Sequence, residues 1–331
     1  MEILEALIDS EKDLVKEFLL KNDLYYEETI DKTLYLKEND SIIGTISKEN
    51  NIIKCFAIDQ NYRGENIANT LISAMINLLY QENINHVMVY TKRLYQDLFI
   101  SFGFSLIINT DIIAILEYGI TNINKEIESI RKNIENKFDI NIFDYNINSI
   151  VINANPITNG HMHLIEEALK TCDYLVVFLL EEDKSYYSFK ERMTLSYIST
   201  LYLQNVIVLP STEYIISNLT FPSYFLKEDN IRNKEWMTTD AFIFKNYFMK
   251  LLNIKYRYVG EESNGVMELY NNTLKEVLGD NLKVIPRLDN ISASEVRKLV
   301  SAGKIDEAIR YIPHQTEQMF RLVSAGKVDG K

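Results

Sequence analysis

The chain has 331 residues, of which 47% are hydrophobic and 25% are charged, and its formal net charge is −12 at pH 7. This length predicts about two domains, and the composition is typical of a soluble globular protein. The acidic balance argues against a general nucleic-acid-binding protein, because phosphate contacts need a basic surface, although a local basic pocket for a nucleotide is compatible with it.

The cysteine content and the chain's apolar runs indicate the compartment. Cys55 and Cys172 are too few for a disulfide framework, and we expect both to be buried, reduced thiols. Residues 1–5 lack the charge pattern of a secretory signal, and the apolar run from Tyr174 to Leu180 is far shorter than the roughly 20 residues of a membrane span. The sequence therefore predicts a cytoplasmic protein without membrane contact.

The first 120 residues mix helices with short strands. Apolar spacing predicts helices over residues 10–20, from the turn near residue 61 to about 80, and 95–102, and strands at 34–36, 41–47, 52–58, 86–90 and 111–117. This order resembles the α+β acetyltransferase fold of the GNAT superfamily. Members of that superfamily bind acetyl-CoA with backbone N–H groups of a glycine-rich turn at a helix start.

The corresponding turn in this chain spans residues 61–66, Asn-Tyr-Arg-Gly-Glu-Asn, with Arg63 and Gly64 as the candidate acetyl-CoA contacts. It departs from the superfamily pattern Q/R-x-x-G-x-G/A, since Asn61 replaces the first residue and Asn66 the second glycine or alanine. A side chain at position 66 could obstruct the pyrophosphate. We therefore interpret this domain as degenerate and kept for packing or partner docking, with acetyl-CoA binding as the alternative.

A helical pattern over residues 120–137 predicts a connecting helix, and we place the domains at residues 1–120 and 146–331 with a linker at 121–145. From residue 148 the pattern alternates strands (149–154, 174–180, 206–209, 256–259, 282–285) with helices (161–171, 188–203, 240–252, 265–278, 293–302). This alternation predicts a doubly wound α/β domain with a parallel sheet. Ligands in such domains bind beyond the carboxyl ends of the strands.

The first of these strands runs into Asn-Ala-Asn-Pro-Ile-Thr-Asn-Gly-His, residues 153–161, and a helical pattern begins after Gly160. A helix start carries free backbone N–H groups and a partial positive charge, which makes it an anion site. Gly160 has no Cβ, so a phosphate can approach the backbone there. Thr158 and His161 place a hydroxyl and an imidazole beside that phosphate. The structural alternative is a helix-capping threonine with a half-buried histidine.

Four segments carry a resemblance to a known family. Thr158-Asn-Gly-His161 resembles the T/H-x-G-H signature of the nucleotidyltransferase superfamily, and Ile291-Ser-Ala-Ser-Glu-Val-Arg297 resembles its C-terminal phosphate motif. With residues 214–226 and 257–262 between them, and with the N-terminal part, the chain is similar to the citrate lyase ligase family over nearly its whole length.

The resemblance implies an acid–thiol ligase that uses ATP. Acetate would attack the α-phosphate to give acetyl-adenylate and pyrophosphate. The thiol of the CoA-like prosthetic group on the acyl-carrier subunit of citrate lyase would then take the acetyl group, and AMP would leave. The sequence has no metal-ligand spacing such as C-x-x-C, so we expect Mg²⁺ to arrive with ATP, held by phosphate oxygens and water.

The resemblance also implies the site residues. Those expected to act on the phosphates are Thr158, His161, Lys184 and Arg297. Those expected to bind ATP are Asn153, Asn155, Gly160, Arg192, Gly260, Glu261, Ser292 and Ser294. Structural alternatives exist for several of them, because Ser292-x-x-Glu295 fits a helix capping box, Lys184 lies in a charged run, and an Asn before Pro is typical of turns.

Two other functions fit parts of the sequence. A cofactor-building adenylyltransferase, which joins ATP to a phosphate such as phosphopantetheine, shares the signature, but the extra N-terminal domain and residues 214–226 favour the ligase. A non-enzymatic acetyl-CoA-binding or docking protein built on residues 1–120 is the third hypothesis, and Asn66 argues against it.

Overall fold

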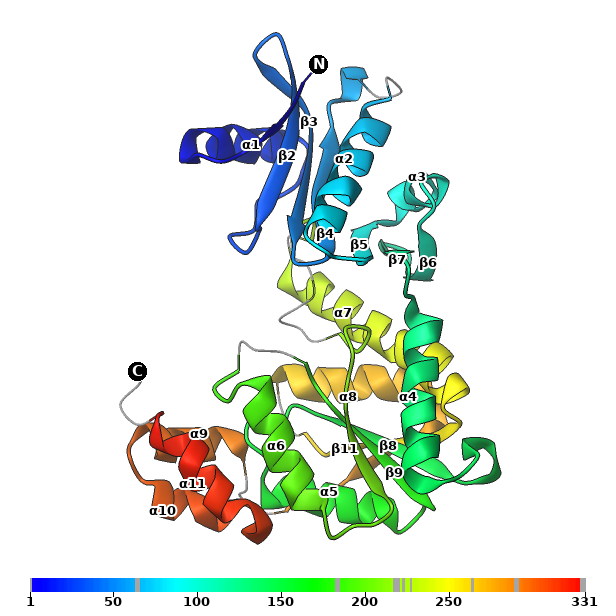
Figure 1. Ribbon diagram of the computed structural model, residues 1–331, viewed down its shortest axis with the longest axis vertical. Coiled ribbons are helices and arrows are strands. Elements are labelled where there is room, and N and C mark those ends of the chain that lie inside the picture. Colours follow the sequence, from blue (N-terminus) through cyan, green and yellow to red (C-terminus); the bar gives the residue numbers. More distant parts are fainter. Residues whose placement is uncertain are drawn as a thin grey trace. The chain divides into compact units, whose positions relative to one another are not determined.

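The chain folds into two compact units, and each has its own sheet (Figure 1). The computed structural model describes residues 2–62, 66–181, 185–216, 221, 224–226, 228–262, 265–288 and 292–327. The first unit comprises Met1–Lys125 and Asn218–Thr239, and the second comprises Glu126–Ser217 and Asp240–Lys331. The predicted domain boundaries near residues 120 and 145 stay predictions.

The first unit is built on a mixed sheet, which within the described residues has seven strands in the order β1-β2-β3-β4-β5-β7-β6. Neighbours are antiparallel except β4 and β5, which are parallel. The strands are β1 (Glu2–Glu5), β2 (Lys32–Glu38), β3 (Ser41–Glu49), β4 (Ile52–Ile58), β5 (His86–Lys92), β6 (Ser105–Asn109) and β7 (Ile113–Gly119), and the helices are α1 (Asp9–Lys21), α2 (Ile67–Gln81) and α3 (Gln96–Ser101). The mixed sheet with packed helices confirms the predicted α+β class. The sequence pattern misses β1 and β6, the two short edge strands.

A later part of the chain completes the core of this first unit. Phe221, Tyr224, Phe225 and Leu226 are all buried, although they come about a hundred residues after β7. The Tyr224 hydroxyl donates to the carbonyl of Tyr90 on β5, and the Tyr25 N–H donates to the carbonyl of Tyr224 over 2.8 Å. The aromatic residues within 221–226 that the structure describes therefore serve core packing.

This segment contacts β5 beyond the stretch that β4 pairs with. The parallel register joins β4 to β5 at Ile52↔Met88 and Ile53↔Val89, before Tyr90 is reached. The Phe221 ring lies edge-on to the Tyr90 ring, with centroids 5.9 Å apart. Phe221 and Tyr224, which are distant in sequence, therefore pack against β5 and bond to it beyond the residues that pair with β4.

The second unit contains a parallel sheet, whose order within the described residues is β10-β9-β8-β11-β12. The strands are β8 (Ile147–Ile152), β9 (Tyr174–Leu179), β10 (Val206–Pro210), β11 (Ile254–Gly260) and β12 (Leu282–Ile285). The helices are α4 (Ile123–Phe138), α5 (Asn159–Leu169), α6 (Phe189–Thr200), α7 (Asp229–Ile243), α8 (Gly265–Leu278), α9 (Ala293–Ser301), α10 (Ile305–Ala308) and α11 (Glu317–Ala325), of which α4 and α7 begin in residues of the first unit.

Helices cover both faces of this parallel sheet. Tyr258 packs in the core that contains residues of α5 and α6, whereas its neighbour Val259 packs with Leu274 of α8. Successive side chains of a strand point to opposite faces. The predicted doubly wound α/β architecture is therefore confirmed.

The winding of the chain reverses at β8. From β8 the chain continues to β9 and β10 on one side, and later returns to add β11 and β12 on the other. Neighbouring strands whose connections leave in opposite directions open a crevice at their carboxyl ends. In this unit the crevice lies between the ends of β8 and β11.

The helix that precedes β11 differs from the prediction. A single helix was expected over residues 240–252, but α7 begins at Asp229 and a π-helical segment, Phe244–Met249, follows it. The first turns of α7 are mostly polar, so apolar spacing does not predict them. The Phe244 and Phe248 rings are stacked with centroids 5.5 Å apart, and this packing accompanies the wider π turn.

Both cysteines are free, as predicted, with Cys55 buried and Cys172 partly buried. Burial raises the pKa of the Cys172 thiol to about 11, so it is not an activated thiolate at neutral pH. The described parts of the chain therefore give no sign that either thiol serves as a nucleophile.

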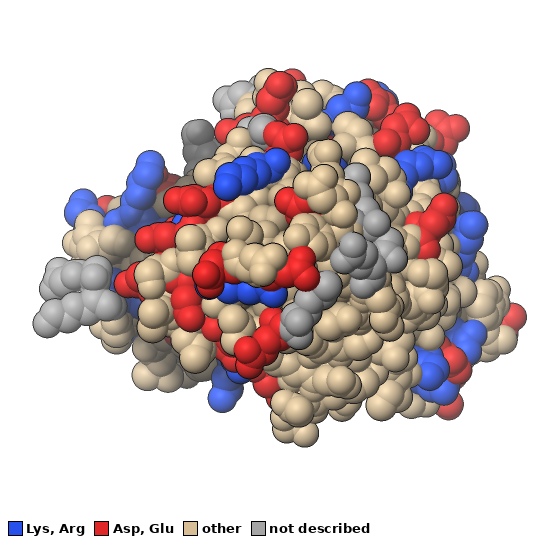
Figure 2. Space-filling view, turned by 90° about the horizontal axis from the view of Figure 1, so that it is seen from above, with Lys and Arg blue, Asp and Glu red and all other residues tan. Residues whose placement is uncertain are grey.

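Charged residues are mixed in sign on the face drawn in Figure 2, where Lys and Arg side chains are scattered among Asp and Glu side chains. Such a face differs from the continuous basic surface that binds a nucleic-acid backbone. Separately, none of the helices within the described ranges has the length and apolar character needed to cross a membrane.

The Tyr224 hydrogen bond gives a stability prediction. Tyr224→Phe removes the donor to the buried Tyr90 carbonyl, so we expect the free energy of unfolding to fall by about 1–3 kcal/mol. Urea unfolding followed by tryptophan fluorescence measures this, because the single tryptophan, Trp236, is buried in the same unit. Tyr197→Phe, at an exposed position of the second unit, is the control and should change stability by less than about 0.5 kcal/mol. Superimposable Tyr224→Phe and wild-type curves would contradict the prediction.

Candidate active site

A cavity of about 360 Å³ opens where β8 and β11 end. Its walls come from those two strand ends, the first turns of α5 and α9, helix α8 and the segment that follows β12. Small-molecule pockets typically measure about 300–1,000 Å³, and doubly wound sheets place them at the reversal of strand order. The position of the cavity is therefore the one that the sequence predicts for a ligand.

Thr158 and His161 form the start of α5. The backbone N–H of Thr158 donates to Nδ1 of His161 over 3.0 Å, and the Thr158 hydroxyl lies 2.8 Å from the same nitrogen. A backbone N–H can only donate, so Nδ1 is an acceptor and the proton of the neutral ring resides on Nε2. Thr158 therefore caps α5, as the structural alternative predicted. The same hydrogen bonds leave His161 as a donor through Nε2–H.

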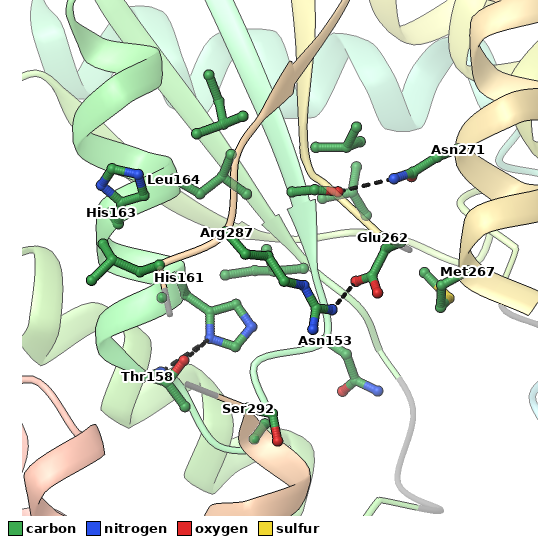
Figure 3. Close-up of a pocket in the computed structure, with 18 of the residues that line it drawn as sticks. Asn153, Thr158, His161, His163, Leu164, Glu262, Met267, Asn271, Arg287 and Ser292 are labelled. Carbon is green, nitrogen blue, oxygen red and sulfur yellow. Dashed lines mark hydrogen bonds and ion pairs between the residues drawn. The ribbon is translucent and has the colours of Figure 1, made fainter. Parts of the chain in front are cut away.

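His161 is uncharged at neutral pH. Burial of the ring removes it from water and lowers its pKa to about 4, and the positive charge of Arg287 lowers the pKa further in the same direction. Figure 3 shows His161 and Arg287 pointing toward one another, whereas the His163 ring points away from them. The ring can therefore donate a hydrogen bond to an anion while the arginine supplies the charge.

A second helix start faces the same cavity. Ser292 is the N-cap of α9, and its Oγ accepts a hydrogen bond from the Glu295 N–H over 3.1 Å. This bond is one half of the predicted capping box. The Glu295 carboxylate, which would form the other half, instead pairs with Lys298 at 3.5 Å. Ser292 and Ser294 both line the cavity. Two helix starts, each with a partial positive charge, thus converge on one space.

Arg287 is a cavity residue that the sequence reasoning missed. It follows β12, its Nε donates to the Glu261 carbonyl over 2.9 Å, and its guanidinium pairs with the Glu262 carboxylate. The side chain is 55% exposed, so it can meet a ligand. Its position directly after a predicted strand, at the ligand-binding edge, was the signal that could have identified it.

The structure brings together most of the predicted site residues. Those that line the cavity are Asn153, Thr158, Gly160, His161, Gly260, Ser292 and Ser294. Glu261 is exposed and does not line it, whereas the adjacent Glu262 does. Lys184 and the proposed acetyl-CoA contacts Arg63 and Gly64 lie outside the described residues.

Arg192 is fully buried beneath the cavity edge and does not line the cavity. Its Nη1 donates to the carbonyls of Asn153 and Leu180 over 2.8 and 2.9 Å, and its Nε donates to the Tyr187 carbonyl over 3.2 Å. Asn153 and Leu180 directly follow β8 and β9. Arg192 therefore ties the ends of two neighbouring strands together.

Arg297 and Asn155 join the two helix starts. Arg297 donates through Nη1 to the Asn155 carbonyl over 2.6 Å and through Nη2 to the Ser294 hydroxyl over 3.0 Å. The Asn155 side-chain oxygen accepts from the Tyr187 N–H over 3.0 Å. Neither Arg297 nor Asn155 lines the cavity, but their bonds hold the loop before α5 against α9.

Comparison with known proteins agrees with this architecture. Residues 147–320 match the family described as citrate lyase ligase C-terminal domain, and residues 7–113 match the acetyltransferase (GNAT) domain. Solved structures are more distant. A bifunctional NMN adenylyltransferase/ADP ribose pyrophosphatase from Francisella tularensis is 16% identical and covers 56% of this chain and 52% of its own, with a TM-score of 0.36.

Curated relatives resemble the chain over nearly its whole length. A citrate (pro-3S)-lyase ligase from Haemophilus influenzae is 34% identical over 92% of this chain and 93% of its own. Those from Escherichia coli K12 and Klebsiella pneumoniae are 32% and 27% identical, over 91% and 90% of this chain and 88% and 86% of their own. The chain belongs to the citrate lyase ligase family.

Proposed function

We propose that the protein activates citrate lyase by attaching an acetyl group to the thiol of the CoA-like prosthetic group on the acyl-carrier subunit. The relatives are named as ligases of citrate lyase, which supports that enzyme as the target. The observation that carries the proposal is the cavity where two helix starts, the Nε2–H of His161 and the Arg287 guanidinium meet. This arrangement suits the triphosphate of ATP.

The proposed reaction has two transfers. An acetate oxygen attacks the α-phosphorus of ATP, the bond from that phosphorus to the β-bridging oxygen breaks, and pyrophosphate leaves with the electron pair. The thiol sulfur of the carrier then attacks the acetyl carbon of acetyl-adenylate and loses its proton, and AMP leaves with the electrons of the acyl–oxygen bond. Neither transfer needs a side-chain nucleophile, so positioning and electrostatics account for the catalysis.

His161 is the catalytic donor in this proposal. Its Nε2–H donates to an α-phosphate oxygen and stabilises the charge that develops there during acetate attack. Because Thr158 fixes the other nitrogen, the donor is oriented before the substrate arrives. A donor that needs no reorganisation during the reaction is the most effective kind.

The remaining phosphates would lie against α9 and Arg287. Ser292 and Ser294 offer hydroxyls, and the backbone N–H groups of the helix start add to them. Lys184, from the charged stretch after β9, is proposed to neutralise the leaving pyrophosphate. Arg192 and Arg297 act through the loops that they hold and are positioning residues in this scheme.

Magnesium would enter with the nucleotide. Within the described residues there is no cluster of three or more His, Cys, Asp or Glu side chains that could hold a metal ion. Mg²⁺ on ATP is commonly held by phosphate oxygens and water, with one or two carboxylates. Glu262, a carboxylate on the cavity wall, fits such a role, and the ion would offset the negative charge on the phosphates.

Acetate-dependent ATP–pyrophosphate exchange tests the function. We expect the wild-type protein to catalyse exchange with acetate, and His161→Ala to lower the rate by at least about 100-fold, because one transition-state donor is lost. His314→Ala, at an exposed site that does not line the cavity, is the matched control and should retain the wild-type rate. An undiminished rate in His161→Ala would defeat the assignment. Exchange that requires phosphopantetheine in place of acetate would indicate cofactor synthesis.

The protonation state of His161 gives a separate test. In the folded protein its pKa is about 4, below the ordinary histidine value of about 6.5, so the unfolded chain binds the proton first as the pH falls. The stability that His161 contributes is therefore present above pH about 6.5 and is lost as the pH falls toward about 4. Long-range ¹H–¹⁵N NMR should show unprotonated Nδ1 and protonated Nε2 from pH 8 to about pH 5, with signals assigned through His161→Gln. A midpoint near pH 6.5 would refute this.

A further inference from the structure

The cavity continues from the strand ends onto the face of the sheet that α8 covers. Val259 packs with α8, and strand alternation places Arg257 on the same face. The register pairs Arg257 with Ser149 of β8, which therefore shares that face. Arg257 lines the cavity, yet it lies three residues before Gly260, or about 10 Å deeper along β11. It marks the inner end of the cavity.

Arg257 is a buried cation, and most of its guanidinium group has a partner. It is 1% exposed, and its Nη2 donates to the Tyr270 hydroxyl over 2.7 Å. Its Nη1 lies 3.5 Å from the Asp240 carboxylate, which also accepts from Tyr270 over 2.5 Å. The guanidinium carbon sits 4.3 Å from the Phe244 ring centroid, over the π-helical segment. These contacts hold the guanidinium rigidly at the inner end.

Two polar atoms in this region have no partner among the described residues. They are the Nε of Arg257, a cavity residue, and the Oγ of Ser149, which faces the same side of the neighbouring strand but does not line the cavity. Buried polar atoms are rarely left without a hydrogen bond in native proteins, and an exception calls for an explanation. The guanidinium N–H of Arg257 suits an anionic oxygen, because it can donate a charge-assisted hydrogen bond to it.

The rest of the inner end is apolar or uncharged. Val151 and Val259 line it together with Tyr270 and Asn271, whose side-chain amide donates to the Gly260 carbonyl over 2.9 Å. Met267 also lines the cavity, but it is 46% exposed and so lies on its open side. Figure 3 shows Met267 and Asn271 on the other side of Arg287 from His161. A short apolar group is therefore accommodated beside the buried ion pair of Arg257 and Asp240.

We propose that the inner end of the cavity, formed by Val151, Arg257, Val259 and Tyr270, binds the carboxylate substrate and that the guanidinium of Arg257 anchors it. The proposal rests on the proposed acid activation at the His161 end. The triphosphate would occupy the two helix starts, and the acid would approach the α-phosphate from the α8 side. Met267, on the open side of the cavity, would contact the alkyl group of a longer acid.

Two variants test the subsite. Arg257→Lys keeps a positive charge opposite Asp240 but removes the guanidinium fork and its Nε–H. We expect the KM for acetate in ATP–pyrophosphate exchange to rise about 10- to 100-fold, while the KM for ATP changes less than about twofold. Arg232→Lys is the matched control, because Arg232 pairs with Asp229 at 3.1 Å and does not line the cavity.

Met267→Ala leaves the buried ion pair intact, and it decides the question if Arg257→Lys does not fold. We expect it to raise kcat/KM for propionate and butyrate relative to acetate by about tenfold, because the wall recedes. Val266→Ala, at an exposed neighbouring position that does not line the cavity, should leave the ratio unchanged.

The outcomes separate the subsite from the overall function. Acetate-dependent exchange in the wild type together with unchanged acetate KM in Arg257→Lys, or an unchanged acid preference in Met267→Ala, would overturn the subsite. An equal rise in the KM values of acetate and ATP would assign Arg257 to the nucleotide instead. Exchange that does not depend on acetate in the wild type would defeat the proposed function itself.

Discussion

The hydrogen bonds between Thr158 and Nδ1 of His161 are the interaction on which the site depends. They satisfy a backbone N–H that the start of α5 would otherwise leave unpaired, so they belong to the stability of the helix. They also determine which ring nitrogen carries the proton. The same pair of residues thus begins the helix and sets the chemistry of the group that faces the cavity, and neither role can change without the other.

Two arginines, the fully buried Arg192 and the partly buried Arg297, support this site. Arg192 ties the ends of β8 and β9, and Arg297 ties the loop before α5 to α9. A buried guanidinium is costly unless its donors are paired, and here carbonyl groups at strand and loop ends pair with them. Loops without internal regularity are thereby held in place. Arg287 is the exposed exception, and its charge remains available at the cavity.

The architecture of the second unit follows from the sequence because short apolar runs rich in β-branched or aromatic residues alternate with helical patterns. Tyr174–Leu179 is almost wholly apolar, as buried parallel strands are, and the helices between the strands have clear spacing. The edge strands β1 and β6 of the first unit have only four and five residues, which is too short for a clear pattern. The first turns of α7 were not predicted because they are mostly polar and so lack apolar spacing.

The site was predictable where a local motif carries it, as at Thr158–His161 and Ser292–Ser294. Arg192 has the residue type and helix position of a phosphate ligand, and only the fold shows its bonds to Asn153 and Leu180. Arg257 was predictable as part of a family segment, but its pairing with Asp240 joins elements that spacing cannot connect. Tertiary contacts, rather than composition, decide which arginines face a ligand.

The segment that contains Phe221 and Tyr224 makes the first unit discontinuous along the chain. This unit closes its core with residues that are synthesised after β8, β9 and β10. On a ribosome, which releases the chain from its N-terminus, the first unit can therefore finish folding only once residues up to about 239 have emerged. Until then its core lacks the buried side chains of that segment, which include Phe221, Tyr224, Phe225, Leu226, Trp236 and Met237. A truncation after residue 125 therefore does not yield a complete first unit, because residues 218–239 are missing from it.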